Sequence, residues 1–205
     1  MAIEGHMGTG GRQDGGTATQ VLDVAERLVQ RRGFNGFSYA DVSAELGITK
    51  AALHYHFASK GELGEALLRR YTARFMSALA ALDAGLDDGR AKIAGYIDLY
   101  SGVLRDDRMC LCGMLAAEYQ TLPPPMQEAV TAFLDENEAW LAGVLEGGRR
   151  DGTFSFSGDA RGRARAIVAV LEGAMLVTRP YRDPRRFEAA VAHLLDDLGP
   201  GASTG

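Results

Sequence analysis

Apolar side chains recur along this chain at the three- and four-residue spacing of amphipathic helices, and no segment alternates as a strand would. Glycine and proline divide the pattern. Gly33 ends the first helical run, and the three prolines at 123–125 separate the sixth run from the seventh. The pattern predicts an all-α fold with helices near 17–32, 39–46, 50–56, 60–83, 89–105, 110–121, 124–149, 159–179 and 185–198.

The segment from Ser38 to Lys60 predicts two short helices separated by a glycine turn and followed at once by a third helix. Ser38 is a good N-cap with Asp41 three residues later, and Gly47 suits a left-handed turn. Thr49 can cap the second of the two helices. Two short helices joined in this way place a recognition helix in the major groove of DNA.

The string LGITKAALHYHFASKGEL resembles the signature of the TetR (tetracycline-repressor, AcrR-like) family of bacterial transcriptional regulators. The matching features are the glycine-apolar turn, the small residues before Leu53, the aromatic-His-aromatic run and the Ser-Lys that opens the next helix. With the preceding TQVLDVAERLVQRRG and FNGFSYADVSAELG, the likeness spans residues 17–70. Family members carry tyrosine where this chain has His54. The resemblance implies a homodimeric repressor that leaves its operator DNA when a small molecule binds.

The outward side chains of the helix at 50–56 are the expected DNA contacts, whereas Leu53 and Phe57 should face inward. Lys50 can reach a guanine edge or a phosphate, and Ala51 a thymine methyl group. The resemblance assigns a phosphate contact to the lysine that opens the next helix. The alternative is that this face of a short helix is simply solvated. The expected DNA-contact set is Thr49, Lys50, Ala51, His54, Tyr55, His56 and Lys60.

The charge distribution sets a limit on DNA affinity. The whole chain carries a formal charge of −5, but residues 12–60 hold six Lys/Arg against five Asp/Glu, which leaves +1 there and −6 elsewhere. The proposed DNA-reading part is therefore less acidic than its companion without being basic. We expect modest phosphate attraction and an affinity that falls quickly with salt.

The two cysteines form a Cys110-x-Cys112 motif near the start of the sixth predicted helix. Their side chains would diverge on a helix, which disfavours a disulfide between them, so both are expected to pack as small core residues. An alternative is a redox or electrophile sensor, since a helix start can lower the pKa of Cys110. Some relatives use a cysteine in this region in that way, and Arg108 is the nearby basic side chain.

Aromatic and methionine side chains gather between residues 71 and 140, which is typical of a core and also of an apolar ligand cavity in a helical bundle. Tyr96 and Tyr100 share one helix face. The resemblance places the inducer pocket among the fourth to eighth helices, and the apolar composition favours a hydrophobic or aromatic inducer. The expected lining residues are Phe75, Tyr96, Tyr100, Met114, Tyr119, Trp140 and Met175.

The last two helices are the expected dimer interface. The helix at 159–179 combines branched apolar residues with small ones that allow close approach, and the helix at 185–198 offers a further apolar stripe. Either helix can instead belong to the monomer core. A dimer is favoured because helix-turn-helix units gain specificity from two half-sites about 34 Å apart.

We expect four parts along the chain: a flexible lead at 1–16, a helix-turn-helix domain at 17–60, a ligand-binding and dimerisation domain at 61–199, and a disordered tail at 200–205. The lead begins MAIEGHM, which looks like residual cloning sequence before a native start at Met7. The boundary inside the fourth helix makes that helix the expected lever between ligand site and recognition helix. No signal peptide or long apolar segment is evident, which predicts a cytoplasmic protein without membrane contact.

Other classes find less support. No nucleophile motif, phosphate loop or HExxH motif is present, so neither an enzyme nor a cofactor is expected. His54 and His56 lie on different sides of a helix and predict no metal site. An activator of the same fold and a helical interaction module that does not bind DNA remain as alternatives.

Overall fold

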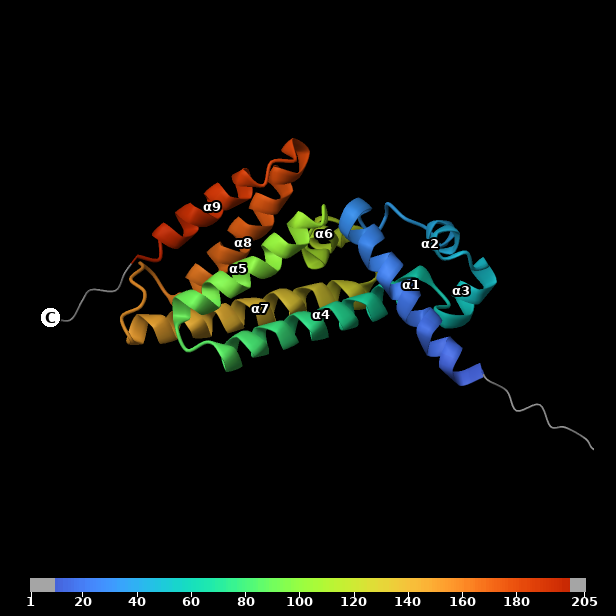
Figure 1. The fold of residues 1–205 in the computed structure, drawn as a ribbon, viewed down its shortest axis with the longest axis horizontal. Coiled ribbons are helices and arrows are strands. Elements are labelled where there is room, and N and C mark those ends of the chain that lie inside the picture. The colour runs from blue at the N-terminus through green and yellow to red at the C-terminus, as the bar shows by residue number, and fades with distance from the viewer. Residues whose placement is uncertain (1–9, 200–205) are drawn as a thin grey trace, which may run out of the picture.

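The computed structural model describes residues 10–199, with side chains from Gly16 onward. This part of the chain is helical and contains no strand, as the apolar pattern predicts (Figure 1). The expected tail at 200–205 and residues 1–9 of the expected lead lie outside the described residues. The helices are α1 Gly10–Arg32, α2 Tyr39–Leu46, α3 Lys50–His56, α4 Lys60–Gly85, α5 Gly89–Arg105, α6 Leu111–Ala117, α7 Pro124–Arg150, α8 Ala160–Thr178 and α9 Arg185–Asp196, with short 3-10 turns η1 Tyr119–Thr121 and η2 Arg179–Tyr181.

The predicted bounds of α2, α3 and α5 agree with the structure, and two others need correction. The first helix begins at Gly10 rather than residue 17, so the last part of the expected lead is helical. The predicted helix at 110–121 is divided, because Glu118 leaves helical geometry between α6 and η1. The Glu118 carboxylate then accepts hydrogen bonds from the backbone N–H groups of Phe34 (2.5 Å) and Asn35 (3.3 Å). The break thus joins the bundle to the loop between α1 and α2.

The regulatory body is a bundle built around α7, which packs against α8, α4, α5 and α6. Figure 1 shows α4 and α7 running side by side along the body, with α5 and α8 across them and α9 outermost. The buried stripe of α7 includes Met126, Phe133 and Leu141, all fully covered. Burying such side chains at helical spacing supplies most of the stability of a bundle.

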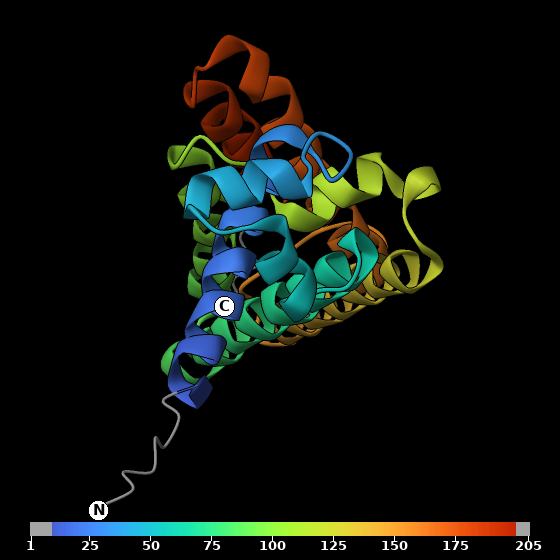
Figure 2. The same ribbon diagram turned by 90° about the vertical axis from the view of Figure 1, so that its right-hand side faces the viewer.

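The expected DNA-reading unit consists of α1, α2 and α3 and sits at one end of the body; Figure 2 shows it in front of the bundle. Its small core contains Val24, Val42, Leu53 and Phe57. The first turn of α4 belongs to this unit, whereas the remainder of the same helix lies in the bundle. One continuous helix therefore connects the two parts.

A buried carboxylate on α1 fastens the DNA-reading unit to α4. Glu26 is only 5% exposed and accepts hydrogen bonds from Arg70 (2.8 Å) and from Arg74. Arg70 also pairs with Asp23 at 2.7 Å. Because both arginines lie on α4, this cluster fixes the angle between α1 and the connecting helix.

We expect Glu26→Gln to destabilise the protein by about 2–3 kcal/mol, which lowers Tm by roughly 5–10 °C for a chain of this size. The loss is smaller than for a fully buried pair because the Arg74 side chain is 56% exposed. The measurement is thermal unfolding by circular dichroism. The control is Glu45→Gln, which breaks the exposed Arg27–Glu45 pair and should cost less than about 1 kcal/mol. Equal losses in the two variants would contradict this assignment.

Candidate nucleic-acid interface and regulatory core

Local hydrogen bonds define the turn between α2 and α3. The backbone N–H and the hydroxyl of Ser38 both donate to the Asp41 carboxylate, at 2.7 and 2.6 Å, and these bonds hold the pKa of Asp41 below its ordinary value. At the other end of α2, Gly47 adopts φ +67°, a left-handed conformation that favours glycine. The Thr49 hydroxyl then accepts the Ala52 N–H at 3.1 Å and caps α3. These predicted caps and the turn are confirmed.

The two sides of α3 are as expected. Leu53 and the following Phe57 are buried, which orients the helix against α2 and the start of α4. On the opposite side Lys50, Ala51 and His54 are exposed, and Tyr55 is 74% exposed. The outer side of α3 therefore presents an ammonium, an imidazole and a phenol, which are groups that can contact base edges and phosphates.

Tyr39 of α2 positions His54 on the outer face. The two rings lie 4.8 Å apart between centroids, and His54 Nδ1 is 3.1 Å from the carbonyl oxygen of Ala58. The Tyr39 hydroxyl donates to the Phe57 carbonyl at 2.9 Å. His56 is half-buried with its ring 5.2 Å from that of Tyr55, so it is less available to DNA than the other expected contacts.

Lys60 has an internal contact that local sequence patterns do not reveal. Its ammonium donates to the Phe37 carbonyl at 2.6 Å and lies over the Phe34 and Phe37 rings, at 4.7 and 4.5 Å from their centroids. Burial lowers the pKa of Lys60, although the charges of Glu118 and Asp41 oppose this shift. A phosphate contact by this lysine would have to share its donors with the Phe37 carbonyl.

A hollow of about 370 Å³ beside α3 brings together three of the expected DNA contacts, Lys50, His54 and Lys60, with the start of α2. Phe37 and Tyr39 also line it. The hollow has two basic side chains at one edge of the recognition helix, a suitable arrangement for a backbone phosphate.

In the bundle, four of the seven expected ligand contacts form one aromatic cluster. Phe75, Tyr96 and Tyr100 are in mutual ring contact, and Trp140 stacks on Tyr96 at 5.7 Å with an interplanar angle of 22°. Tyr71 and Phe133, which the prediction left out, complete the cluster.

The other three expected ligand contacts lie on α6, η1 and α8. Met175 is buried in α8, and Met114 receives a contact from Arg179 at 3.8 Å between nitrogen and sulfur. Tyr119 belongs to η1, where its carbonyl accepts a hydrogen bond from Gln127. A part for these three residues in a ligand site stays a prediction.

Polar groups line one side of the aromatic cluster. The hydroxyls of Tyr96 and Tyr100 are 3.1 Å apart, and Asn137 Nδ2 donates to the Tyr100 hydroxyl at 3.3 Å. The Tyr71 hydroxyl is 3.6 Å from Cys110 Sγ. Asn137 is fully buried in α7 and was not among the predicted site residues, because one polar residue in a helix carries little signal.

Glu172 of α8 is the second polar residue that the prediction missed. It interrupts the longest apolar run, from Ala166 to Val177, and that interruption was the available signal. Its Oε1 is covered, and burial raises the pKa of Glu172 to about 7, although a hydrogen bond with Cys110 opposes the shift. Gly113 of α6 makes room for this carboxyl, since a Cβ there would lie 2.0 Å from Glu172 Oε2.

Cys110 and Cys112 are both buried and free, as expected for core thiols. Burial, followed by the negative charge of Glu172, raises the pKa of Cys110; burial also raises that of Cys112, together with the charges of Cys110 and Glu172. The expectation that a helix start lowers the pKa of Cys110 is wrong. Arg108 supplies no compensating charge, because it pairs with Asp106 and hydrogen-bonds Gln30. A redox role for this pair stays a prediction.

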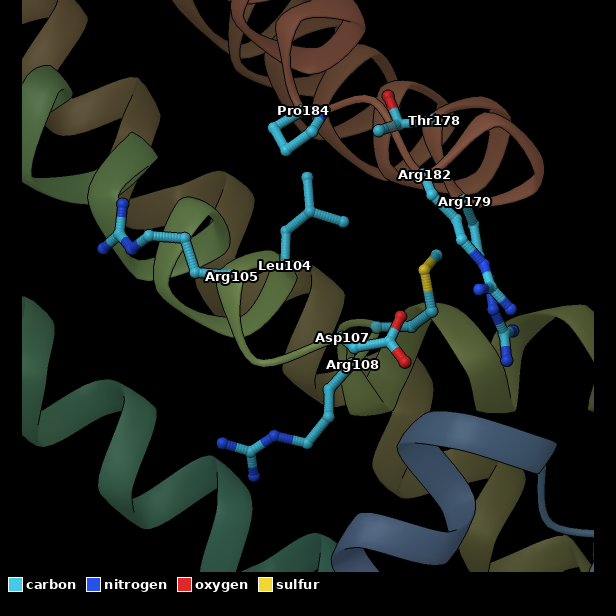
Figure 3. A pocket seen from close by; sticks show the side chains of 9 residues that line it. Leu104, Arg105, Asp107, Arg108, Thr178, Arg179, Arg182 and Pro184 are labelled. Atoms are coloured by element: carbon cyan, nitrogen blue, oxygen red, sulfur yellow. The ribbon is translucent and has the colours of Figure 1, made fainter.

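A cleft of about 250 Å³ lies between the end of α5 and the α8–η2 segment (Figure 3). Leu104, Thr178 and Pro184 surround it, and in this view Arg105 points away from its interior. Arg179, from the same wall, donates to the main-chain carbonyl of Arg31 at the end of α1. Arg179 therefore both lines the cleft and bonds the DNA-reading unit to the body.

Among the described residues, no helix is long and apolar enough to cross a membrane. Within the same part of the chain, no group of three or more His, Cys, Asp or Glu side chains is placed to hold a metal ion.

The raised pKa of Glu172 predicts how stability depends on pH. Below about pH 4.5 the Glu172 carboxyl is protonated in both the folded and the unfolded chain, so its ionisation costs the fold no stability there. As pH rises toward 7, the unfolded chain ionises first, so folding loses up to about 3 kcal/mol. Glutamine does not titrate. The Tm of Glu172→Gln minus the Tm of the parent protein should therefore increase from pH 5 to pH 8.

Thermal unfolding at the two pH values checks this expectation. Glu188→Gln removes one carboxyl from the exposed face of α9 and controls for the change in net charge. A Tm difference between Glu172→Gln and the parent that is the same at pH 5 and pH 8 would show that Glu172 titrates normally in the fold.

Comparisons with known proteins agree with this architecture. The family model for bacterial regulatory proteins of the tetR family matches residues 21–67, and the model for the tetracyclin repressor-like C-terminal domain matches residues 89–194. The HTH-type transcriptional repressor NemR of Escherichia coli is 28% identical over 185 residues, which cover 87% of this chain and 92% of NemR.

Solved structures give the same result. A TetR-family transcriptional regulator from Agrobacterium tumefaciens is 33% identical, with a TM-score of 0.87 over 90% of this chain and 98% of that one. The reduced form of Escherichia coli NemR is 28% identical, with a TM-score of 0.77 over 91% of this chain and 99% of that one. The chain therefore belongs to the TetR family, and it is a ligand-responsive transcriptional regulator whose relatives include repressors.

Proposed function

We propose that this protein acts in the cytoplasm as a homodimeric repressor that binds two operator half-sites and is released by a small molecule held in its bundle. Residues 17–60 form the DNA-binding domain, and residues 61–199 bind ligand and join the two copies. The observation that carries the proposal is the exposed outer face of α3, held rigidly by the Gly47 turn, the Thr49 cap and the buried Leu53.

On this face Lys50, Ala51 and Tyr55 are exposed, and they are the base and phosphate contacts of the proposal. Thr49 and His54 flank them. His56 and Lys60 are half-buried, so we assign them weaker contacts with the phosphate backbone of the DNA. Since the unit carries a charge near +1, specificity depends more on these few contacts than on general attraction to phosphate.

The two copies join through α8 and α9. Val170, Leu176, Val177 and Tyr181 are the large apolar side chains of the body that stay exposed in a single chain, and all four lie on α8 or on η2 directly after it. Exposed apolar side chains gathered in this way support a contact with a second copy. The inducer of this proposal is a small apolar or aromatic molecule that binds at the Phe75, Tyr96, Tyr100 and Trp140 cluster.

A ligand in that cluster acts on α4, because Phe75 lies on this helix and α4 continues into the DNA-reading unit. Binding favours a bundle geometry in which α4 tilts and the two recognition helices no longer match the spacing of the half-sites. A differential affinity of a few kcal/mol between the two states is sufficient to release most of the DNA.

DNA binding is tested by mobility shift with the DNA upstream of the protein's own gene and scrambled competitor. We expect specific binding at low salt, a steep loss as salt rises, and protection of two half-sites one helical turn, about 34 Å, apart or a multiple of it. The Lys50→Ala/Tyr55→Ala variant should lose at least roughly tenfold in affinity, since each base or phosphate contact contributes about 1–3 kcal/mol.

The control is Arg150→Ala, which removes an exposed charge at the C-terminal end of α7, outside both α3 and the proposed dimer interface, and should leave DNA binding intact. If the folded parent protein binds no specific DNA at low salt, the proposal fails and a helical interaction module takes its place.

The dimer surface is tested by Val177→Glu. Val177 is 59% exposed in the single chain, so a charge there costs the monomer little but would be buried without a partner in the dimer. Sedimentation at micromolar concentration should shift from dimer to monomer. Ala81→Glu, on the exposed side of α4, is the matched control and should stay dimeric. A dimeric Val177→Glu variant would place the interface elsewhere.

A further inference from the structure

Three buried side-chain oxygen atoms of the bundle helices lack a hydrogen-bond partner in the described structure: Oδ1 of Asn137, Oε1 of Glu172 and Oγ1 of Thr178. The Thr178 hydroxyl lies at the end of α8 and lines the cleft of Figure 3. The Asn137 and Glu172 oxygens are acceptors. The neighbouring polar groups, Tyr96, Tyr100 and the Asn137 amide nitrogen, are already bonded to one another. Burying an acceptor without a donor costs about 1–3 kcal/mol. What this core lacks is therefore a donor.

Both acceptors belong to the environment of Tyr96. Burial, followed by the negative charges of Cys110 and Glu172, raises the pKa of the Tyr96 phenol, while hydrogen bonds with Tyr100 and Asn137 lower it. Asn137 meets the aromatic cluster at the Tyr100 hydroxyl, and Glu172 hydrogen-bonds Cys110, whose Sγ lies 3.6 Å from the Tyr71 hydroxyl of the same cluster. The helices that carry the two acceptors, α7 and α8, pack directly against each other. One ligand group can thus serve the two acceptors.

The aromatic rings beside these acceptors favour a positive charge. Tyr96 contacts the rings of Phe75, Tyr100 and Trp140 at centroid distances of 6.2, 5.3 and 5.7 Å. The faces of such rings attract cations, most strongly where water is excluded. A carboxyl group of raised pKa in the same core adds a negative charge once a cation stabilises its ionised form.

A surface cavity of about 420 Å³ reaches the edge of this core. It lies between α1 and α4–α5, with Glu26 and Gln30 on one wall and Arg74 and Val103 on the other. Tyr71 lines this cavity, and its hydroxyl lies 3.6 Å from Cys110 Sγ inside the bundle. The wall of this cavity carries both acidic and basic side chains, so it favours neither cations nor anions. The charge preference for a ligand must therefore come from the core behind Tyr71.

We propose that the core takes a protonated amine with an aromatic or apolar substituent, whose ammonium donates to Glu172 and Asn137 while its substituent packs on the Tyr96 and Trp140 rings. This inference rests on the proposed inducer site and narrows its ligand to organic cations. A neutral aromatic molecule leaves the Glu172 oxygen without a donor, and an anion is repelled by it.

The chain offers a built-in reporter, because Trp140 is its single tryptophan and stacks on Tyr96. The probes are benzylamine, benzyl alcohol and benzoate, which share one ring and differ in charge. Titrations of Trp140 fluorescence at pH 7.5 should show benzylamine binding at least tenfold more tightly than benzyl alcohol, with benzoate weakest. Equal affinities for the amine and the alcohol, or no response to the amine, would overturn the proposal.

Glu172→Gln keeps the size of the side chain and removes its charge, so the preference for benzylamine over benzyl alcohol should fall close to one. Glu188→Gln removes an exposed carboxyl of α9 and should keep the full preference. Asn137→Leu is a second, independent variant that should weaken benzylamine several-fold and benzyl alcohol little. Thermal unfolding verifies that each variant is folded. A preference that survives Glu172→Gln contradicts the assignment of the ammonium to this carboxyl.

Mobility shift with the same preparations separates this inference from the proposed function. If the parent protein binds its operator but does not distinguish the three probes, the proposed amine site is wrong and the proposed repressor function stands. If the parent protein prefers benzylamine but binds no specific DNA, the proposed repressor function is wrong and the proposed amine site stands. If both hold, benzylamine should release the parent protein from DNA, and Glu172→Gln should resist release.

Discussion

The carboxylate of Glu26 bonds to two arginines on α4 and so fixes how the DNA-reading unit meets the body. Glu118 and Arg179 also bond this unit to the body, but from α6–η1 and η2, so the Glu26 cluster is the ionic link between α1 and α4 themselves. With the pair in place, α1 follows any tilt of α4. The remaining pairs of this region, such as Arg27 with Glu45, are exposed and contribute little by comparison.

The bundle core shows the opposite use of polar groups. Glu172 and Asn137 occupy positions where leucine would add stability, and each leaves an oxygen without a partner. Gly113 gives up helix propensity to make room for the Glu172 carboxyl. Each of α6, α7 and α8 thus gives up stability inside the bundle, at Gly113, Asn137 and Glu172. That pattern is typical of a binding site rather than of packing alone.

Features set by neighbours along the chain could be predicted from the sequence. The Ser38–Asp41 cap, the left-handed Gly47 and the Thr49 cap depend on a few adjacent residues, and the resemblance to the TetR family covers the same segment. Helix positions followed from apolar spacing for the same reason. Agreement was weakest where the helix ends depend on distant partners, as at Glu118, which serves a loop 84 residues away.

Features that depend on distant contacts could not be predicted in this way. Lys60 looks like a surface lysine in the sequence, but folding places the Phe37 carbonyl and two rings around its ammonium. The aromatic cluster was recovered only in part, since helical spacing identifies a face but not which faces meet. Met114 and Tyr119 have partners that spacing along the chain does not reveal, the Arg179 side chain for Met114 and the Gln127 amide for the carbonyl of Tyr119.

The DNA-reading unit is held to the body at three places, and this decides how a ligand can act. Besides the Glu26 cluster, Glu118 bonds the loop after α1, and Arg179 bonds the end of α1 itself. These contacts come from α4, from the α6–η1 break and from η2. A unit fastened at three places cannot swing freely, so a change in the bundle reaches α3 as a rigid displacement. Reversing a 99:1 preference needs about 5.5 kcal/mol of differential binding. A ligand that satisfies two buried acceptors and stacks on aromatic rings can supply energy of this order, because each of those groups is desolvated before it binds.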